Sequence, residues 1–230
     1  MRILTIDTST MISEVTILEN KEIICDFSMN QEKTHSESLV PLIDKALKSQ
    51  GLKLSDIDVI GIALGPGSFT GLRIGLTVAK TLSQFSNAKI IGISTLEALA
   101  KGVYQKDRLI VPLIDARGKL VFYGGFVNNE AHIKEGMIEI DKLIDNLKEE
   151  NPIFLGEITE KYRKDLEKIG EVCTFNFNNC IGKNLALLTY ERAIKNDFDN
   201  LYELTPNYLR KSQAEIDLIK KREKEGEKHV

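Results

Sequence analysis

Cysteine is scarce in this chain of 230 residues, and the few cysteines are poorly placed for chemistry. The three of them, Cys25, Cys173 and Cys180, are odd in number and lack the paired spacing of metal ligands. This pattern argues against both a disulfide framework and a zinc site. A reducing cytoplasm is the compartment that fits it best.

Histidine is equally scarce, and no catalytic arrangement can be assembled around it. His35 lies near a predicted helix start, but Leu39 occupies the position four residues later, so a paired metal ligand is missing. His132 and His229 lie far from it in the sequence. Neither Ser68 nor any cysteine has a base nearby, so the sequence predicts no nucleophilic triad and no peptidase site.

The sequence also lacks an excess of positive charge and any long apolar run. Its formal net charge is −3 and its pI is about 5.8, so no overall positive field indicates nucleic-acid binding, and any RNA contact must be local or supplied by a partner. The first apolar run, "MRILTIDTS", is broken by Asp7 and does not read as a signal peptide. No segment reaches the roughly 18 apolar residues of a membrane helix, so no membrane contact is expected.

Hydrophobic periodicity predicts one order of elements that occurs twice. The first copy has three strands, a helix, and then strand, helix, strand, helix, at residues 2–8, 12–18, 22–28, 38–50, 58–64, 70–86, 89–94 and 95–104. The second copy begins with strands at residues 108–115, 119–127 and 131–138, and it ends with a strand at 171–177 and a helix at 182–196. The repetition predicts an α/β fold with two mixed-sheet lobes, each of β-β-β-α-β-α-β-α order.

The predicted lobes span residues 1–106 and 107–212, followed by a charged tail at 213–230. Each lobe opens with a strand that ends in Ile-Asp, at Asp7 and Asp115. Ligands of α/β sheets bind beyond the carboxyl ends of the strands, which makes both carboxylates candidate ligand residues.

Two interpretations of "IDTST" stay open. Asp7 can orient a metal-bound water or a phosphate, with Thr8 and Ser9 offering hydroxyl groups, or it can close its strand with an Asx turn. For Asp115, a structural pair with Arg117 is the simpler interpretation.

The glycine-rich segment "GPGSFTG" also has two interpretations. It is not a Walker A loop, because Leu72 follows its last glycine, and it misses the spacing of a dinucleotide-binding loop by one residue. It is either a strand-to-helix turn in which Ser68 or Thr70 caps the helix, or an anion site at the start of that helix. The full candidate anion or nucleotide site comprises Asp7, Thr8, Ser9, Gly65, Gly67, Ser68 and Asp115.

The two long helices of the first lobe are more apolar than a surface helix requires. Apolar residues of the helix at 70–86 spread over roughly 200°, and those of the helix at 38–50 over roughly 160°. Pro41 is tolerated only in a first turn, which predicts Ser38 as the N-cap of the earlier helix. The excess indicates either additional core or an interface with another chain.

Five segments together resemble the bacterial TsaB (YeaZ) family: "MRILTIDTS", "GPGSFTGLRIG", "GISTLEALA", "PLIDARGKLVFYGGF" and "TPNYLRKS". The resemblance runs from Met1 to about Ser212. It implies a duplicated actin-like, ribonuclease-H-like (ASKHA) fold, which agrees with the repeated order of elements.

The resemblance also implies a role in tRNA modification in which this chain is not the enzyme. TsaB-like proteins pair with the paralogue TsaD, joined by the ATPase TsaE, in the complex that transfers a threonylcarbamoyl group to N6 of adenosine 37 in tRNA. TsaD carries ATP, a metal ion and the catalysis, whereas TsaB is a scaffold that forms a homodimer when the partner is absent. No cofactor is expected on this chain alone, because the second histidine of the TsaD metal pair is missing and "FLGE" offers only Gly156 where actin-like ATPases have a glycine-rich turn.

The family pairing uses the two long helices of the first lobe. The interface predicted from it comprises Leu39, Leu42, Ile43, Leu47, Phe69, Leu72, Arg73, Leu76, Ala79 and Lys80. With this placement, Leu72→Asp is expected to abolish partner binding and to leave the fold intact. The competing hypothesis is a stand-alone actin-fold ATPase or kinase that uses Asp7 and Asp115 around Mg-ATP.

Overall fold

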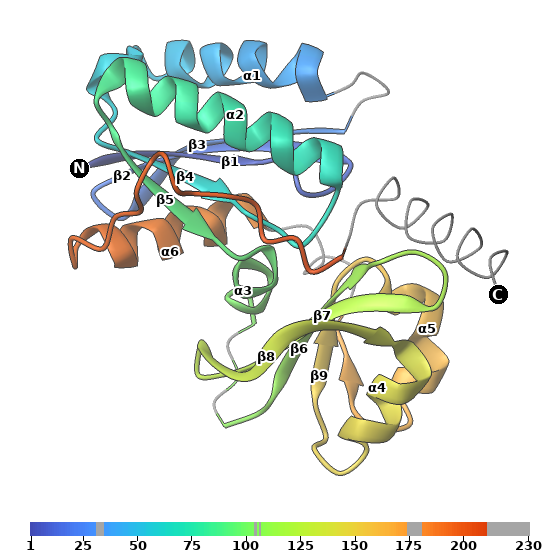
Figure 1. Ribbon diagram of the computed structural model, residues 1–230. Helices are drawn as coiled ribbons and strands as arrows, with labels where there is room; N and C mark the ends of the chain where they lie inside the picture. The colour runs from blue at the N-terminus through green and yellow to red at the C-terminus, as the bar shows by residue number, and fades with distance from the viewer. Residues whose placement is uncertain (31–34, 104, 106, 174–180, 211–230) are drawn as a thin grey trace, which may run out of the picture.

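The computed structural model describes residues 1–30, 35–103, 105, 107–173 and 181–210. It contains two five-stranded sheets, one in each of two lobes, with the second lobe below the first in Figure 1. The first has the order β3-β2-β1-β4-β5 and consists of β1 (Arg2–Asp7), β2 (Ile12–Glu19), β3 (Glu22–Asn30), β4 (Val59–Ala63) and β5 (Lys89–Ile93). The second has the order β10-β9-β6-β7-β8 and consists of β6 (Ile110–Asp115), β7 (Leu120–Val127), β8 (Glu130–Glu139), β9 (Ile153–Leu155) and β10 (Glu171–Val172).

The two sheets repeat one topology. In each, three consecutive strands form an antiparallel meander, and the first strand of the meander also pairs in parallel with the fourth strand of its lobe. This arrangement confirms the predicted duplicated fold with two mixed-sheet lobes. The strand predicted at 171–177 is described only as Glu171–Val172, and residues 174–177 lie outside the described residues.

Six helices are described. They are α1 (His35–Ser49), α2 (Phe69–Ser86), α3 (Thr95–Ala100), α4 (Ile140–Leu147), α5 (Thr159–Leu166) and α6 (Ile181–Ala193), with a short 3-10 turn at Leu54–Asp56. The predicted N-cap of α1 is wrong, since the helix begins at His35 and Ser38 lies inside it. Pro41 also lies inside α1, where its ring faces outward and is exposed.

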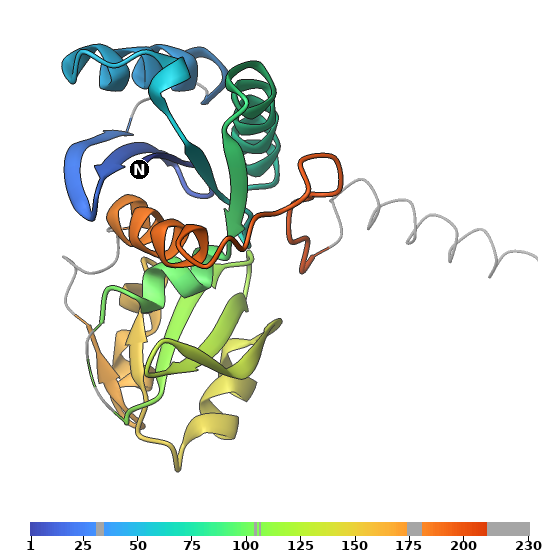
Figure 2. The same cartoon turned by 90° about the vertical axis from the view of Figure 1, so that its left-hand side faces the viewer.

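Helix α6 packs against the sheet of the first lobe, although it follows the second-lobe strands in the sequence. The boundary at residue 107 assigns it to the second lobe, yet it contacts β1, β2, β4 and β5 of the first sheet. Figures 1 and 2 show α1 and α2 on one face of that sheet and α6 on the other, with α3 between α6 and the second lobe. One apolar core therefore joins the lobes, and it includes Ile3 and Ile91 of the first sheet and Ile110 and Leu155 of the second.

The segment that follows α6, residues 198–210, runs back along the first sheet, and we call it the C-terminal strap. Its Asp199 forms a bridge with Ile90 of β5 and accepts a hydrogen bond from Gly92 N at 2.8 Å. Further on, Asn207 N donates to Leu64 O at 2.8 Å. The strap thus covers the open edge of β5, whose backbone groups would otherwise be available for pairing.

No helix within the described ranges has the length and apolar character needed to cross a membrane.

Candidate functional site

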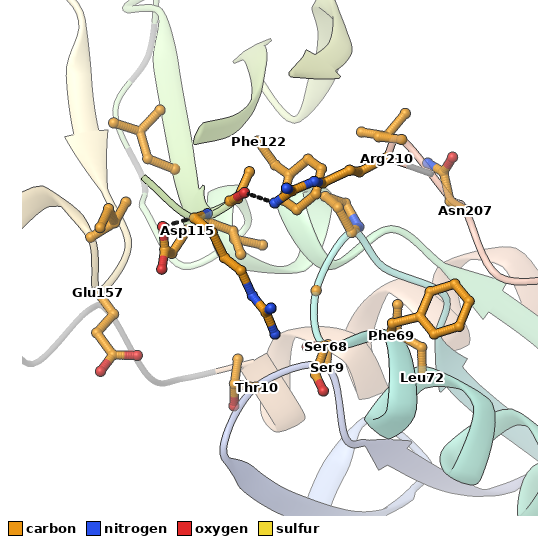
Figure 3. A pocket seen from close by; sticks show the side chains of 18 of the residues that line it. Ser9, Thr10, Ser68, Phe69, Leu72, Asp115, Phe122, Glu157, Asn207 and Arg210 are labelled. Carbon is orange, nitrogen blue, oxygen red and sulfur yellow. Dashed lines mark hydrogen bonds between the residues drawn. The ribbon is translucent and has the colours of Figure 1, made fainter. Parts of the chain in front are cut away.

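A cleft of about 790 Å³ lies between the two lobes. Its first-lobe wall is formed by the β1–β2 loop and the start of α2, including Ser9, Thr10 and Ser68 (Figure 3). Its second-lobe wall includes Asp115 and Phe122, and Arg210 of the strap lies at its side. The volume lies in the range of small-molecule sites.

The glycine-rich turn before α2 is explained by packing. Ser68 is the N-cap of α2, where its hydroxyl accepts a hydrogen bond from Gly71 N at 3.2 Å, so the predicted cap at Ser68 is confirmed. A Cβ at Gly71 would lie 2.0 Å from Thr8 O, and one at Gly67 would lie 2.3 Å from Ser9 O. These glycines let α2 approach the β1–β2 loop closely. Thr8 secures the contact by donating its hydroxyl to Gly71 O at 2.7 Å.

Asp7 closes its strand with the Asx turn that was one of the two interpretations. Its Oδ1 accepts a hydrogen bond from Ser9 N at 2.8 Å. The carboxylate is only 1% exposed, it does not line the cleft, and its Oδ2 has no hydrogen-bond partner among the described residues. Burial raises the pKa of Asp7, although the amide of Ser9 opposes this effect. Asp7 is therefore separated from any ligand in the cleft.

Glu14 lies next to Asp7 in the sheet, since the two residues are cross-strand partners. Its Oε2 accepts a hydrogen bond at 2.6 Å from Gly182 N in the first turn of α6. Burial, and after it the charge of Asp7, raise the pKa of Glu14 to about 8. Sequence reasoning missed the burial of Glu14, because the residue that binds its carboxyl group, Gly182, lies 168 positions further along the chain.

Asp115 repeats the turn of Asp7 in the second lobe, but on the surface. Its Oδ1 accepts a hydrogen bond from Arg117 N at 2.9 Å, so the predicted pairing of these two residues occurs through the backbone. Asp115 is exposed and lines the cleft. Of the seven residues of the candidate anion site, the cleft is lined by Ser9, Gly67, Ser68 and Asp115 and not by Asp7, Thr8 or Gly65.

Two cleft residues that the candidate anion site omitted are cations from distant segments. Lys161 of α5 donates to Gly118 O at 3.2 Å, and the guanidinium of Arg210 donates to Ala116 O. Both hold the β6–β7 turn. Of these two cations, only Arg210 lies in a family segment, "TPNYLRKS", and no sequence signal pointed to Lys161.

His35 holds the β1–β2 loop with both ring nitrogens. Its Nδ1 lies 2.7 Å from Ser13 Oγ, and its Nε2 lies 3.0 Å from Thr10 O. Within residues 1–30, 35–103, 105, 107–173 and 181–210, no three side chains of His, Cys, Asp or Glu gather in a way that could hold a metal ion.

The structure corrects most of the predicted partner interface. Seven of its ten residues are at most 8% exposed because they pack in the core of this chain; they are Leu39, Leu42, Ile43, Leu47, Leu72, Leu76 and Ala79. Much of the wide apolar arc of each helix is thus used against the sheet and the neighbouring helix. Phe69, Arg73 and Lys80 remain at least partly accessible.

An apolar band nevertheless remains on the outer side of these helices. On α2 it consists of Ile74, Val78 and Leu82, which are half-buried, and Phe85, which is 81% exposed. On the neighbouring α1, Val40 is 53% exposed. We call these five residues the outer apolar band. The four α2 residues are spaced by three or four positions and therefore lie along one side of the helix, and apolar side chains that remain accessible in this way are typical of an interaction site.

The start of α2 is tied to the strap by an aromatic cluster. The rings of Phe69 and Tyr208 lie 4.8 Å apart between centroids, and the guanidinium carbon of Arg73 lies 4.0 Å from the centroid of the Phe69 ring. Arg73 Nε also donates to the Tyr208 hydroxyl at 2.9 Å. The strap therefore fixes the position of Arg73 on the edge of α2 that faces Tyr208.

Comparison with known proteins places this architecture in a family. The family model described as "TsaD: tRNA N6-adenosine threonylcarbamoyltransferase" matches residues 22–219. The "tRNA threonylcarbamoyladenosine biosynthesis protein TsaB" of Bacillus subtilis (strain 168) is 31% identical over 234 residues, which cover 95% of this chain and 98% of that protein. A "tRNA N6-adenosine threonylcarbamoyltransferase" of Thermodesulfovibrio yellowstonii is 34% identical over 119 residues, 45% of this chain and 36% of that enzyme.

A solved structure shows the same fold. "YeaZ from Pseudomonas aeruginosa" superposes with a TM-score of 0.74 at 21% identity, covering 90% of this chain and 99% of that chain. Together with the sequence matches, it confirms the resemblance that the five motif segments indicated.

Proposed function

The chain belongs to the TsaB (YeaZ) family, and we propose that it is the non-catalytic scaffold subunit of the complex that transfers a threonylcarbamoyl group to N6 of adenosine 37 in tRNA. It acts by dimerising with the catalytic TsaD-type paralogue through α1 and α2. The relatives named for tRNA threonylcarbamoyladenosine biosynthesis support the process. The residues of the first lobe support the proposed role of this chain as a scaffold in that process.

The outer apolar band is the observation that carries the scaffold role. Phe85 is its most exposed member, and an exposed aromatic ring on a regular helix is a typical anchor of a protein interface. The TsaD family model matches this chain over residues 22–219, so the paralogue shares the lobe that presents the band. Two related lobes can meet about a pseudo-twofold axis through equivalent helices.

The surroundings of the polar residues agree with a non-catalytic role. Asp7 is buried and bound to Ser9 N, and His35 has both ring nitrogens engaged with the β1–β2 loop. ATP and a metal ion are expected on the partner subunit, and tRNA is expected to reach this chain only through the complex. The other proposed partners are a TsaE-type ATPase and, when the paralogue is absent, a second copy of this chain.

Light scattering after size exclusion tests the proposal, with this chain alone and mixed with the TsaD-type protein of the same organism. We expect a 1:1 complex, and Phe85→Asp is expected to raise its Kd at least tenfold while the melting temperature stays unchanged. Ile194→Asp is the matched control, because Ile194 is 55% exposed at the end of α6 on the other side of the sheet. Equal affinities of the two variants would contradict the proposed interface.

The alternative function, a stand-alone ATPase or kinase, is favoured only by the volume of the cleft. Calorimetric titration of the isolated chain with Mg-ATP distinguishes this alternative from the scaffold role. Micromolar binding that Asp115→Ala removes would support the alternative, and the absence of heat would count against it. Asp115 is the residue to change, since it lines the cleft and Asp7 does not.

A further inference from the structure

The two interface helices carry positive charge in a chain that is acidic as a whole. Helix α2 contains Arg73 and Lys80 and no acidic residue. Helix α1 contains the acids Glu37 and Asp44 and the bases Lys45 and Lys48. Four bases against two acids give the pair of helices a net charge of +2, whereas the whole chain has −3.

The exposed face of α2 has an apolar edge and a basic edge, and both run along the length of the helix. At about 100° per residue, the outer apolar band occupies one edge, and Arg73 and Lys80 occupy the opposite edge. Thr77 and Thr81, both exposed, lie between the two edges. Arg73 and Lys80 are seven residues apart, which is two turns or about 10 Å along the helix. A partner that extends from the apolar band across Thr77 and Thr81 to the opposite edge of α2 meets two cations at a fixed spacing.

The described part of the chain supplies no carboxylate to these cations. Neither Arg73 nor Lys80 belongs to any of its ion pairs, and Asp44 of α1 is already bound to Lys48 at 2.7 Å. Arg73 is also held in place, because its Nε donates to Tyr208 and its guanidinium lies over Phe69. A side chain that is ordered before binding loses little entropy when a partner pairs with it.

We propose that the surface that docks on α1 and α2 is a helix face of the TsaD-type paralogue with an apolar stripe and, beside it, carboxylates about two turns apart. This proposal rests on the proposed function and adds the chemistry of the partner. The same charge pattern makes the heterodimer more stable than the homodimer. In a twofold homodimer each positive α1–α2 surface faces an identical one, and the acid-free α2 brings only cations to the contact.

A charge reversal tests this inference directly. Lys80→Glu is compared with Lys164→Glu, which makes the same change of net charge on the exposed side of α5 in the second lobe. Kd and the association rate with the TsaD-type protein are measured at several salt concentrations, and self-association is measured by sedimentation equilibrium. Lys80→Glu is expected to raise the heterodimer Kd about tenfold, to slow association and to flatten its salt dependence, while strengthening the homodimer. Lys164→Glu is expected to change none of these.

The outcomes separate this inference from the proposed function. If Phe85→Asp weakens the complex but Lys80→Glu behaves like Lys164→Glu, the apolar contact stands and the inferred acidic partner face is wrong. If the wild-type chain forms no complex with the paralogue, both are wrong. Lys80→Gln removes the charge without adding one, and it is expected to give an intermediate Kd; thermal melting confirms that each variant is folded.

Discussion

The two lobes share one strand order but present different helix surfaces to their surroundings. In the second lobe, α5 and its flanks are covered by ion pairs, such as those of Arg163 with Glu160 and Glu167. In the first lobe, α2 has no acidic residue and presents the outer apolar band. The two lobes therefore share one topology and differ in the chemistry of their helix surfaces, and the apolar surface of the first lobe is the one that we propose for the partner.

The largest loss of stability is expected on the buried side of α2, which the interface predicted from the sequence included. Leu72 is 2% exposed, so Leu72→Asp places a charge in the core and is expected to cost more than about 4 kcal/mol of unfolding free energy. This replaces the expectation that the variant would stay folded. Urea unfolding of Leu72→Asp and Phe85→Asp measures the difference, and a folded, stable Leu72→Asp protein would show that this side of α2 is not core.

The second prediction concerns the pH dependence of stability and compares the turns after β1 and β6. The turn after β1 is buried beside Glu14, whereas the turn after β6 is exposed. The folded pKa of Glu14, about 8, is above its unfolded value of 4.5. Its contribution to stability is therefore complete below pH 4.5 and is lost as the pH rises through 8. Between pH 5 and pH 9 the loss is expected to be on the order of 4 kcal/mol.

Glu14→Gln should abolish most of this loss, since an amide cannot ionise. Asp115→Asn, at the matching exposed turn, is the control for the removal of one carboxyl group. Melting temperatures of the wild type and both variants between pH 5 and pH 9 test the difference. Parallel curves for the wild type and Glu14→Gln would show that Glu14 is not the group responsible.

A glycine packed against the loop after β1 and a glycine in the turn after β6 give a third, smaller contrast. A Cβ at Gly71 would lie 2.0 Å from Thr8 O, a backbone atom that cannot move aside alone, so Gly71→Ala is expected to cost about 2 kcal/mol or more. Gly118, in the turn after β6, has φ +72 and open space around it, so Gly118→Ala meets only backbone strain of about 1 kcal/mol. Urea unfolding of both variants compares the two costs. A cost for Gly118→Ala equal to or above that for Gly71→Ala would mean that packing against Thr8 is not what requires glycine.

Local patterns predicted much of this structure from the sequence. The repeated strand order, the cap at Ser68 and the Asx turn at Asp7 depend on residues close together in the chain, so their signals are present in short segments. The position of α6 beneath the first sheet could not be read in this way, because its contact between Gly182 and Glu14 joins segments far apart in the sequence. Likewise, the apolar arc of α2 did not reveal which of its sides the sheet and α1 would cover.

The smallest effect on stability is expected at an exposed ion pair of the second lobe. Lys142 and Glu139 form an ion pair at 3.0 Å with both side chains more than half exposed, so Lys142→Ala is expected to change stability by no more than about 0.5 kcal/mol. It should also leave the affinity for the TsaD-type protein unchanged, because α4 lies in the lobe away from α2 (Figure 1). Urea unfolding and the same light-scattering titration measure both quantities. A marked loss of affinity would mean that the partner also contacts the charged lobe, and the division of roles between the two helix surfaces would then be wrong.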